Sequence, residues 1–232
     1  MKLFKILVII TVFTFLSQCK KEEKNTLKAT KNTSKEIKQK TVKKVVKPWD
    51  SLNHKNTTAF LTKYGNQHKE NKVLIKTSLG NITLRLYEET PLHRASFIFL
   101  TKIGYFNSTV FYRIVKNMAV QGGDSDNKTT ARIRNKYRNY VIKPEINPYK
   151  KHKYGALAAA RNLDNNPNKL SSPFDFYIVS NKYGAHHLDG DYTIFGEVIS
   201  GFSTIQKIAA VKTTPDEWPI EDIPMTIEVL DK

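Results

Sequence analysis

An arginine and a glutamine eight residues apart are the side chains in this sequence best placed to do chemistry. Arg113 lies in the largely apolar run 111–115, and Gln121 opens a Gln-Gly-Gly-Asp turn at 121–124. Strand alternation predicts that Arg113 shares a face with Phe111, where partial loss of hydration favours donation to a carbonyl or carboxylate. A structural arginine with a glutamine in a turn is an equally good interpretation of the same residues. The segment therefore indicates a candidate site without assigning a reaction.

The pair His186 and His187, followed by Asp189, has the residue types of a metal site. Adjacent residues on a strand point to opposite faces, so two neighbouring histidines rarely share one ion. We therefore expect no metal here. His93 is expected to pack on a helix surface or against a strand, and no serine lies in a hydrolase nucleophile motif.

Basic residues alternate with other types over 132–138, at positions Arg132, Arg134, Lys136 and Arg138. Such a row is typical of a nucleic-acid-binding face. A solvated insertion loop beside a substrate groove, favouring acidic peptides, is the alternative that we prefer. We expect no nucleic-acid partner.

The net charge of +17 also suggests nucleic acid, but its distribution does not. Residues 1–76 carry 18 Lys and Arg against 5 Asp and Glu, whereas residues 77–232 carry 20 against 16. The excess charge therefore belongs to the front of the chain. With 40% hydrophobic and 11% aromatic residues, the chain can build a core. Its single cysteine, Cys19, excludes an internal disulfide framework and a multi-cysteine metal site.

The elements that must position Arg113 and Gln121 have the pattern of short strands with two helices. Thr90 and Pro91 predict the start of a helix that ends at Gly104, and 203–210 predicts a second, shorter helix. Alternating residues predict strands over 73–77, 82–87, 109–115, 119–121, 156–160, 174–179, 193–198 and 226–230, the first two joined by a turn at 79–81. The pattern favours a closed or sandwich-like β domain.

We place this domain at 73–232. Residues 48–72 predict a short helical segment that leads into it. Asp50 or Ser51 is expected to cap a helix that Gly65 ends. The apolar positions of this helix are Leu52, Ala59, Phe60 and Tyr64.

Residues 1–18 have the features of a lipoprotein signal peptide. Two lysines precede an apolar run at 6–16, which is shorter than the roughly 20 residues of a membrane-spanning helix. The run ends at Leu-Ser-Gln-Cys19, which resembles a bacterial lipobox, and in that family the cysteine carries lipid. Residues 19–47 predict a flexible, Lys-rich tether. We expect lipid on Cys19 to hold the protein at a membrane of a bacterial cell envelope, with a plain signal peptide or N-terminal anchor as the alternative.

The segment 111–124 resembles the signature of the cyclophilin family of peptidyl-prolyl cis-trans isomerases. Further blocks match in the family's order at 77–84, 90–93, 104–106, 155–161, 176–179 and 188–198. The resemblance covers roughly 73–230. It implies a closed eight-stranded antiparallel β-barrel capped by two helices, and isomerisation of X–Pro bonds without a cofactor.

The same resemblance implies roles for individual residues. Arg113 matches the family's catalytic arginine, and Gln121 matches the glutamine that contacts the substrate backbone or orients the arginine. Four residues match the proline pocket, two match positions that bind the peptide backbone, two match the rim, and Phe111 is counted with them as a ninth substrate-binding position. The positions that match substrate contacts are Phe111, Met118, Ala119, Ala160, Arg161, Tyr177, His187, Leu188 and Tyr192.

Several positions depart from the family's pattern. Met118 and Ala119 stand where phenylalanine and methionine are usual, and Asp175 stands where glutamine is common. His187 replaces a tryptophan associated with cyclosporin binding, so we expect weak cyclosporin affinity. The expected function is a monomeric isomerase that acts on proline-containing peptides and assists the folding of exported proteins. A catalytically weak, peptide-binding chaperone or adaptor is the alternative.

Overall fold

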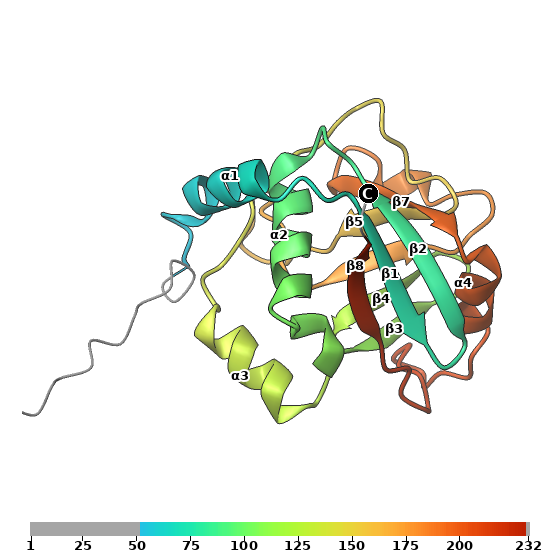
Figure 1. Ribbon diagram of the computed structural model, residues 1–232. Helices are drawn as coiled ribbons and strands as arrows, with labels where there is room; N and C mark the ends of the chain where they lie inside the picture. The colour runs from blue at the N-terminus through green and yellow to red at the C-terminus, as the bar shows by residue number, and fades with distance from the viewer. Residues whose placement is uncertain (1–51, 231–232) are drawn as a thin grey trace, which may run out of the picture. The chain divides into compact units, whose positions relative to one another are not determined.

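Eight antiparallel strands form one curled sheet in the computed structural model, which describes residues 52–230 (Figure 1). In spatial order the sheet runs β3-β4-β6-β5-β7-β2-β1-β8, and each neighbouring pair is antiparallel. The strands are β1 (Lys72–Thr77), β2 (Gly80–Leu86), β3 (Val110–Val115), β4 (Ala119–Asp124), β5 (Ala156–Ala159), β6 (Phe176–Val179), β7 (Ile194–Ser200) and β8 (Thr226–Leu230). The predicted eight-stranded architecture is confirmed.

The two ends of the sheet meet along a short seam. The Phe111 N–H donates to the Ile223 carbonyl at 3.0 Å, and the Met225 N–H donates to the Thr109 carbonyl at 3.2 Å. The segment that enters β8 therefore lies beside β3, and the curled sheet closes on itself.

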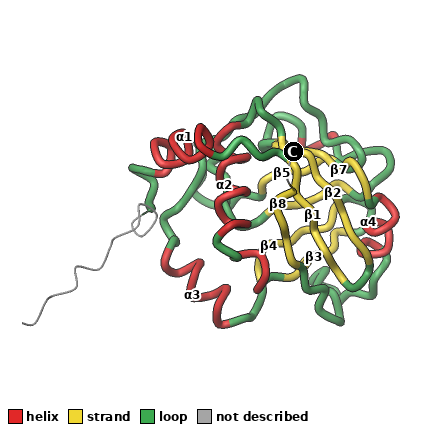
Figure 2. Tube along the Cα trace, in the orientation of Figure 1, coloured by secondary structure: helices red, strands yellow, loops and turns green. Residues whose placement is uncertain are grey.

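Within the described residues, four α-helices accompany the sheet. They are α1 (Thr57–Gln67), α2 (Pro91–Lys102), α3 (Lys128–Lys136) and α4 (Phe202–Ala209), with short 3-10 turns η2 (Tyr105–Ser108) and η3 (His186–Leu188). Helices α2 and α4, the two predicted within 73–232, lie on opposite sides of the strands (Figure 2). No helix in this part of the chain has the length and apolar character to cross a membrane.

Helix α2 is buried along nearly its whole length. Every residue from His93 to Thr101 is buried, whereas the sequence predicted a single inward face. Phe97 contacts Phe106, Phe176 and Phe195, with ring centroids 4.8 to 5.6 Å apart. These rings form the centre of the core, where removing one aromatic side chain costs about 3–5 kcal/mol.

A carboxylate from a distant loop completes the start of α2. Thr90 and Pro91 occupy the predicted N-cap and first helical positions, but the Thr90 side chain makes no capping bond. Glu145 instead accepts hydrogen bonds from the N–H groups of Leu92 and His93, each at 3.0 Å, and lies 2.6 Å from His93 Nδ1. A negative charge at a helix N-terminus is favourable because the first N–H groups have no partner within the helix.

The prediction for α1 was wrong in its details. The helix begins at Thr57, and Ala59 is exposed. The predicted apolar positions Leu52, Phe60 and Tyr64 do pack into or against the core, together with the buried Leu61. Gly65 does not end the helix; a Cβ there would lie 3.0 Å from Ala95 Cβ, so the glycine allows α1 to approach α2 closely. The suggested caps at Asp50 and Ser51 lie outside the described residues, as do the signal segment 1–18, Cys19 and the tether 19–47.

The basic row at 132–138 is largely a helix and not a loop. Asn127 caps α3 by accepting from the Thr129 N–H at 2.8 Å. Arg134 folds inward and donates from both terminal nitrogens to Asp175, at 3.0 and 3.1 Å. This half-buried, two-point ion pair anchors α3, and a count of apolar residues does not reveal it.

Candidate active site

A bulge in β3 decides which way Arg113 points. The pairing of β3 with β4 joins Phe111 to Gly122 and Arg113 to Gln121, so Tyr112 is an extra residue. Because a bulge reverses the alternation, Phe111 and Ile114 both lie in the core while Arg113 lies on the outer face. The predicted shared face of Arg113 and Phe111 was therefore wrong. Phe111 is 0% exposed and stabilises the barrel from inside, where a substrate does not reach it.

Four strands carry a row of side chains across this outer face. Arg113 on β3 is paired with Gln121 on β4, which is paired with Tyr177 on β6, which is paired with Ala158 on β5. Directly opposed residues of antiparallel strands project on the same side of the sheet. The sheet thus brings together two residues that lie 64 positions apart in the sequence, Arg113 and Tyr177.

Two oxygen atoms contact the Arg113 guanidinium. One terminal nitrogen lies 2.6 Å from Glu217 Oε2, and the other donates to Gln121 Oε1 at 3.4 Å. The Arg113 side chain is 41% exposed and that of Glu217 is 36% exposed. Arg113 is therefore only partly dehydrated, and no motif in the sequence pointed to Glu217.

Gln121 is itself held by a chain of polar contacts. Its Nε2 donates to the Tyr112 hydroxyl, which donates to Asp175 Oδ1 at 3.4 Å, and Asp175 also accepts from Ser172 Oγ at 2.7 Å. Burial and the nearby Asp175 carboxylate raise the pKa of Tyr112. The hydroxyl therefore stays protonated and able to donate to Asp175. Asp175, which stands where the family commonly has glutamine, thus links Gln121 through Tyr112 to Arg134 on α3.

An apolar cluster covers the outer face next to this row, separate from the barrel core. We call it the outer cluster. Ala119 and Tyr177 form its buried floor, at 1% and 5% exposure, and Met118, Leu188 and Tyr192 are half-buried around them. Its members are Ala119, Ala156, Ala158, Tyr177, Val179, Ala185 and Ile194, with Tyr87, Met118, Ala160, Leu188 and Tyr192 packed against them. The four residues matched to a proline pocket therefore all lie together.

A buried chain of three polar groups fixes the floor of the outer cluster. The Tyr177 hydroxyl lies 2.9 Å from His152 Nε2, and His152 Nδ1 lies 2.8 Å from Asp189 Oδ1. Since an ionised carboxylate only accepts, Nδ1 carries the proton and Nε2 accepts from Tyr177. We call this the Tyr-His-Asp chain.

The pKa values of His152 and Asp189 in this chain are both lowered, for different reasons. Burial lowers the pKa of His152 more than Asp189 raises it. Burial raises the pKa of Asp189, but hydrogen bonds from the His152 backbone and ring outweigh it and bring the value to about 2. The chain is therefore a neutral imidazole between a hydroxyl and a carboxylate at neutral pH. No group of three or more His, Cys, Asp or Glu in the described residues could hold a metal, and Asp189 contacts His152 and His186 instead.

The rim residues lie beside the outer cluster. Arg161 Nε donates to the Asp191 carbonyl at 3.0 Å, and its guanidinium lies 4.9 Å from the Tyr192 ring centre. Ala160 already uses both backbone groups within the protein, donating to the Asp175 carbonyl and accepting from the Ser172 N–H. A bound peptide that donates to the Ala160 carbonyl would have to share it with the Ser172 N–H. His187 is exposed on η3.

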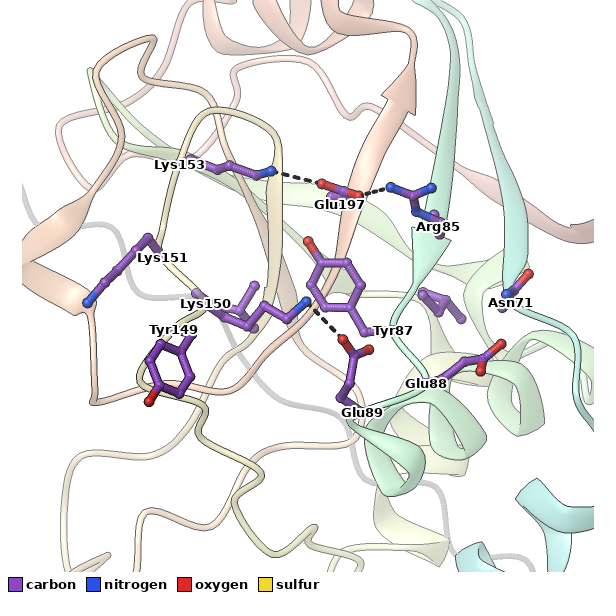
Figure 3. A pocket seen from close by; sticks show the side chains of 12 residues that line it. Asn71, Arg85, Tyr87, Glu88, Glu89, Tyr149, Lys150, Lys151, Lys153 and Glu197 are labelled. Atoms are coloured by element: carbon purple, nitrogen blue, oxygen red, sulfur yellow. Dashed lines mark hydrogen bonds and ion pairs between the residues drawn. The ribbon is translucent and has the colours of Figure 1, made fainter.

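A hollow of about 750 Å³ adjoins the outer cluster, whose members Tyr87 and Ile194 line it together with residues of β2, β7 and the loop 149–153 (Figure 3). Five of its charged side chains pair with one another. Glu197 contacts Arg85 and Lys153, so although burial alone raises its pKa, these contacts hold it at about 2. Lys150 lies 3.8 Å from the Tyr87 ring centre and 3.2 Å from Glu89. Size alone therefore does not identify the functional site.

Comparison with known proteins matches the strand-rich part of the chain to one family. Residues 72–229 match the family model described as cyclophilin type peptidyl-prolyl cis-trans isomerase/CLD. A Gibberella zeae peptidyl-prolyl cis-trans isomerase-like 1 is 32% identical over 152 residues, which cover 65% of this chain and 89% of that protein. An Acinetobacter baylyi peptidyl-prolyl cis-trans isomerase is 33% identical over 149 residues, covering 61% and 73%.

Solved structures give the same result. A Cryptosporidium parvum cyclophilin superposes with a TM-score of 0.59 at 27% identity, covering 70% of this chain and 99% of that one. The same protein was also crystallised in the presence of the dipeptide Ala-Pro. A cyclophilin from Hirschia baltica, at 17% identity and a TM-score of 0.54, shares the fold.

Proposed function

Because this chain belongs to the cyclophilin family of peptidyl-prolyl cis-trans isomerases, we propose that Arg113, Gln121 and the outer cluster isomerise X–Pro bonds in exported proteins. The observation that carries the assignment is the row that pairs Arg113 with Gln121 and Gln121 with Tyr177 across three strands. It sets a cation beside an apolar surface on one face of the sheet.

The reaction needs no bond to be broken. Rotation about an X–Pro bond meets a barrier of about 18–20 kcal/mol because the C–N bond has partial double-bond character. A catalyst must bind the twisted amide more tightly than either planar isomer. Twisting makes the proline nitrogen pyramidal and a better hydrogen-bond acceptor, which a fixed guanidinium can stabilise.

Each part of the outer face has a role in this proposal. The proline ring packs on Met118, Ala119, Tyr177 and Leu188, and the chain on either side runs past Arg161, His187 and Tyr192. Arg113 donates to the prolyl nitrogen as the bond twists. Gln121, held by Tyr112, keeps its amide oxygen towards Arg113.

A protease-coupled or NMR exchange assay on a proline peptide tests the assignment. We expect an Arg113→Ala variant to lose about 100-fold in kcat/KM, the loss that follows removal of one donor to a transition state. The change Arg138→Ala, on an exposed residue after α3, is the matched control and should leave the rate unchanged. Equal rates for the wild-type chain and the Arg113 variant would contradict the proposed role.

A second candidate function uses the same surface. The floor residues Ala119 and Tyr177 are almost fully buried, so they offer little surface to an inserted ring. Such limited contact suits a peptide-binding chaperone or adaptor whose turnover is low. Retained peptide binding in the wild-type chain, with isomerisation no faster than in buffer, would favour this function.

We place the protein at the bacterial cell envelope through lipid on Cys19. The support is the sequence of residues 1–19, with its two lysines, short apolar run and terminal cysteine. Labelling cells with a fatty acid should mark the wild-type chain and not a Cys19→Ser variant. Unchanged labelling of the variant would contradict the anchor and leave the isomerase assignment standing.

A further inference from the structure

The loop 212–219 holds the backbone of Glu217 against strand β3. The Glu217 carbonyl accepts from the Ile114 N–H at 2.8 Å, and the Glu217 N–H donates to the Thr214 carbonyl at 3.0 Å. The Thr214 N–H in turn donates to the Trp218 carbonyl at 2.7 Å. Both backbone groups of Glu217 are therefore fixed, and one of them is fixed by the residue next to Arg113.

This backbone position is unfavourable for a glutamate. Glu217 has a φ of 67°, in the left-handed region that glycine adopts readily and that a residue with a Cβ adopts at a cost. A glycine at this position would satisfy the same two backbone hydrogen bonds with less strain. Strain of this kind persists where the side chain has a function, so the carboxylate is the part of Glu217 to explain.

The carboxylate makes the shortest contact of the Arg113 guanidinium. It lies 2.6 Å from one terminal nitrogen, whereas the contact with Gln121 at the other terminal nitrogen is 3.4 Å long. Arginine has a long side chain with several rotatable bonds, and Arg113 is 41% exposed. Without Glu217, one long hydrogen bond would be left to orient the guanidinium.

We infer that Glu217 is a positioning residue that aims the Arg113 guanidinium at the bound prolyl bond. It occupies one terminal nitrogen, and Gln121 accepts from one N–H of the other. The second N–H of that nitrogen and the Nε–H are left to the substrate. The inference rests on the proposed role of Arg113. It predicts that Glu217 contributes in the transition state and little to the binding of the planar peptide.

Three substitutions in the full-length chain test the inference. Glu217→Gly relieves the backbone strain, so the melting temperature should stay equal or rise while kcat falls about tenfold and KM stays within about twofold. Glu217→Gln keeps an oxygen acceptor and should lie between the glycine variant and the wild type. Asp216→Asn, an equal charge change on the exposed neighbouring residue, is the control and should match the wild type.

NMR of the arginine side chains provides a readout that does not depend on turnover. The Arg113 Nε–H signal should shift and report faster motion in Glu217→Gly, and neither change should occur in Asp216→Asn. An unmoved Arg113 signal would overturn the inference, as would a kcat in Glu217→Gly equal to or above that of the wild type. If the wild-type chain showed no isomerisation, the proposed function would fail, and the Arg113 signal would still decide whether Glu217 positions that side chain.

Discussion

Two acidic residues hold two parts of the site, and they do so in different surroundings. Asp189 holds His152 and, through it, the Tyr177 ring, in a chain whose histidine is 0% exposed. Glu217 holds Arg113 at the edge of the outer cluster, where both side chains are more than a third exposed. The buried contact fixes a surface, whereas the exposed contact orients a group that must meet a substrate. We therefore expect the first to govern stability and the second to govern turnover.

The largest loss of stability should follow a change at His152, the middle residue of the Tyr-His-Asp chain. His152→Ala leaves the Asp189 carboxylate and the Tyr177 hydroxyl without their shared partner, and should lower the free energy of unfolding by about 3 kcal/mol. His54→Ala, on an exposed histidine, is the matched control and should change it by no more than about 0.5 kcal/mol. Urea denaturation measures both. A small loss for His152→Ala would show that burial of this chain does not govern stability.

Acid should weaken the buried contact next. The pKa of Asp189 in the folded protein is about 2 against an ordinary value of 3.8, so its contribution is present above pH 4 and is lost as the pH falls towards 2. The pKa of His152 is also lowered, so protonation of the unfolded chain begins to cost stability below about pH 6.5. Both shifts act in the same direction. Denaturation midpoints from pH 7 to pH 2 should fall, with a flatter fall between pH 4 and pH 2 in Asp189→Asn.

A smaller effect should follow removal of one hydroxyl. Tyr177→Phe keeps the ring of the outer cluster and leaves His152 Nε2 without its partner, so we expect a loss of about 1 kcal/mol in the free energy of unfolding. The change in kcat should be less than twofold. A large fall in kcat with unchanged stability would mean that the hydroxyl takes part in turnover, which would blur the distinction between the two acids.

Added salt should give the smallest change in activity, and it should act mainly on the exposed Arg113–Glu217 contact. The screening length is about 10 Å at 0.1 M salt and about 3 Å at 1 M, so added NaCl weakens the Arg113–Glu217 pair more than the buried chain. We expect kcat to fall by about twofold at 1 M NaCl in the wild type and to be insensitive in Glu217→Gln. An equal fall in both would show that salt acts elsewhere.

Much of the fold could be predicted from local pattern. Alternating apolar residues located the strands, and Thr90 with Pro91 located the start of α2, because these features depend on neighbours in the sequence. The bulge at Tyr112 could not be predicted, since one extra residue leaves the composition of β3 unchanged while turning Arg113 to the other face. The helix α3 was missed for a similar reason: it is anchored by Asp175, 41 residues from Arg134.

The site divides in the same way. The family signature brought Arg113, Gln121 and the pocket positions to attention, because they lie in short ordered blocks. Glu217 and His152, which support these residues, lie in loops that meet the site only because the barrel closes. No motif in the sequence around either residue indicates this role. Phe111 shows the opposite error, since it sits inside the signature yet packs in the core.

The seam of the barrel bears on how an extended peptide can meet the protein. The N–H groups of Phe111 and Ile114 on β3 are already engaged by Ile223 and Glu217. An open strand edge recruits any extended polypeptide as a further strand, and such ladders grow into aggregates. Here the edge of β3 is already hydrogen-bonded, so an extended peptide must bind through its side chains. Such a peptide can dissociate without breaking a row of backbone hydrogen bonds to the sheet.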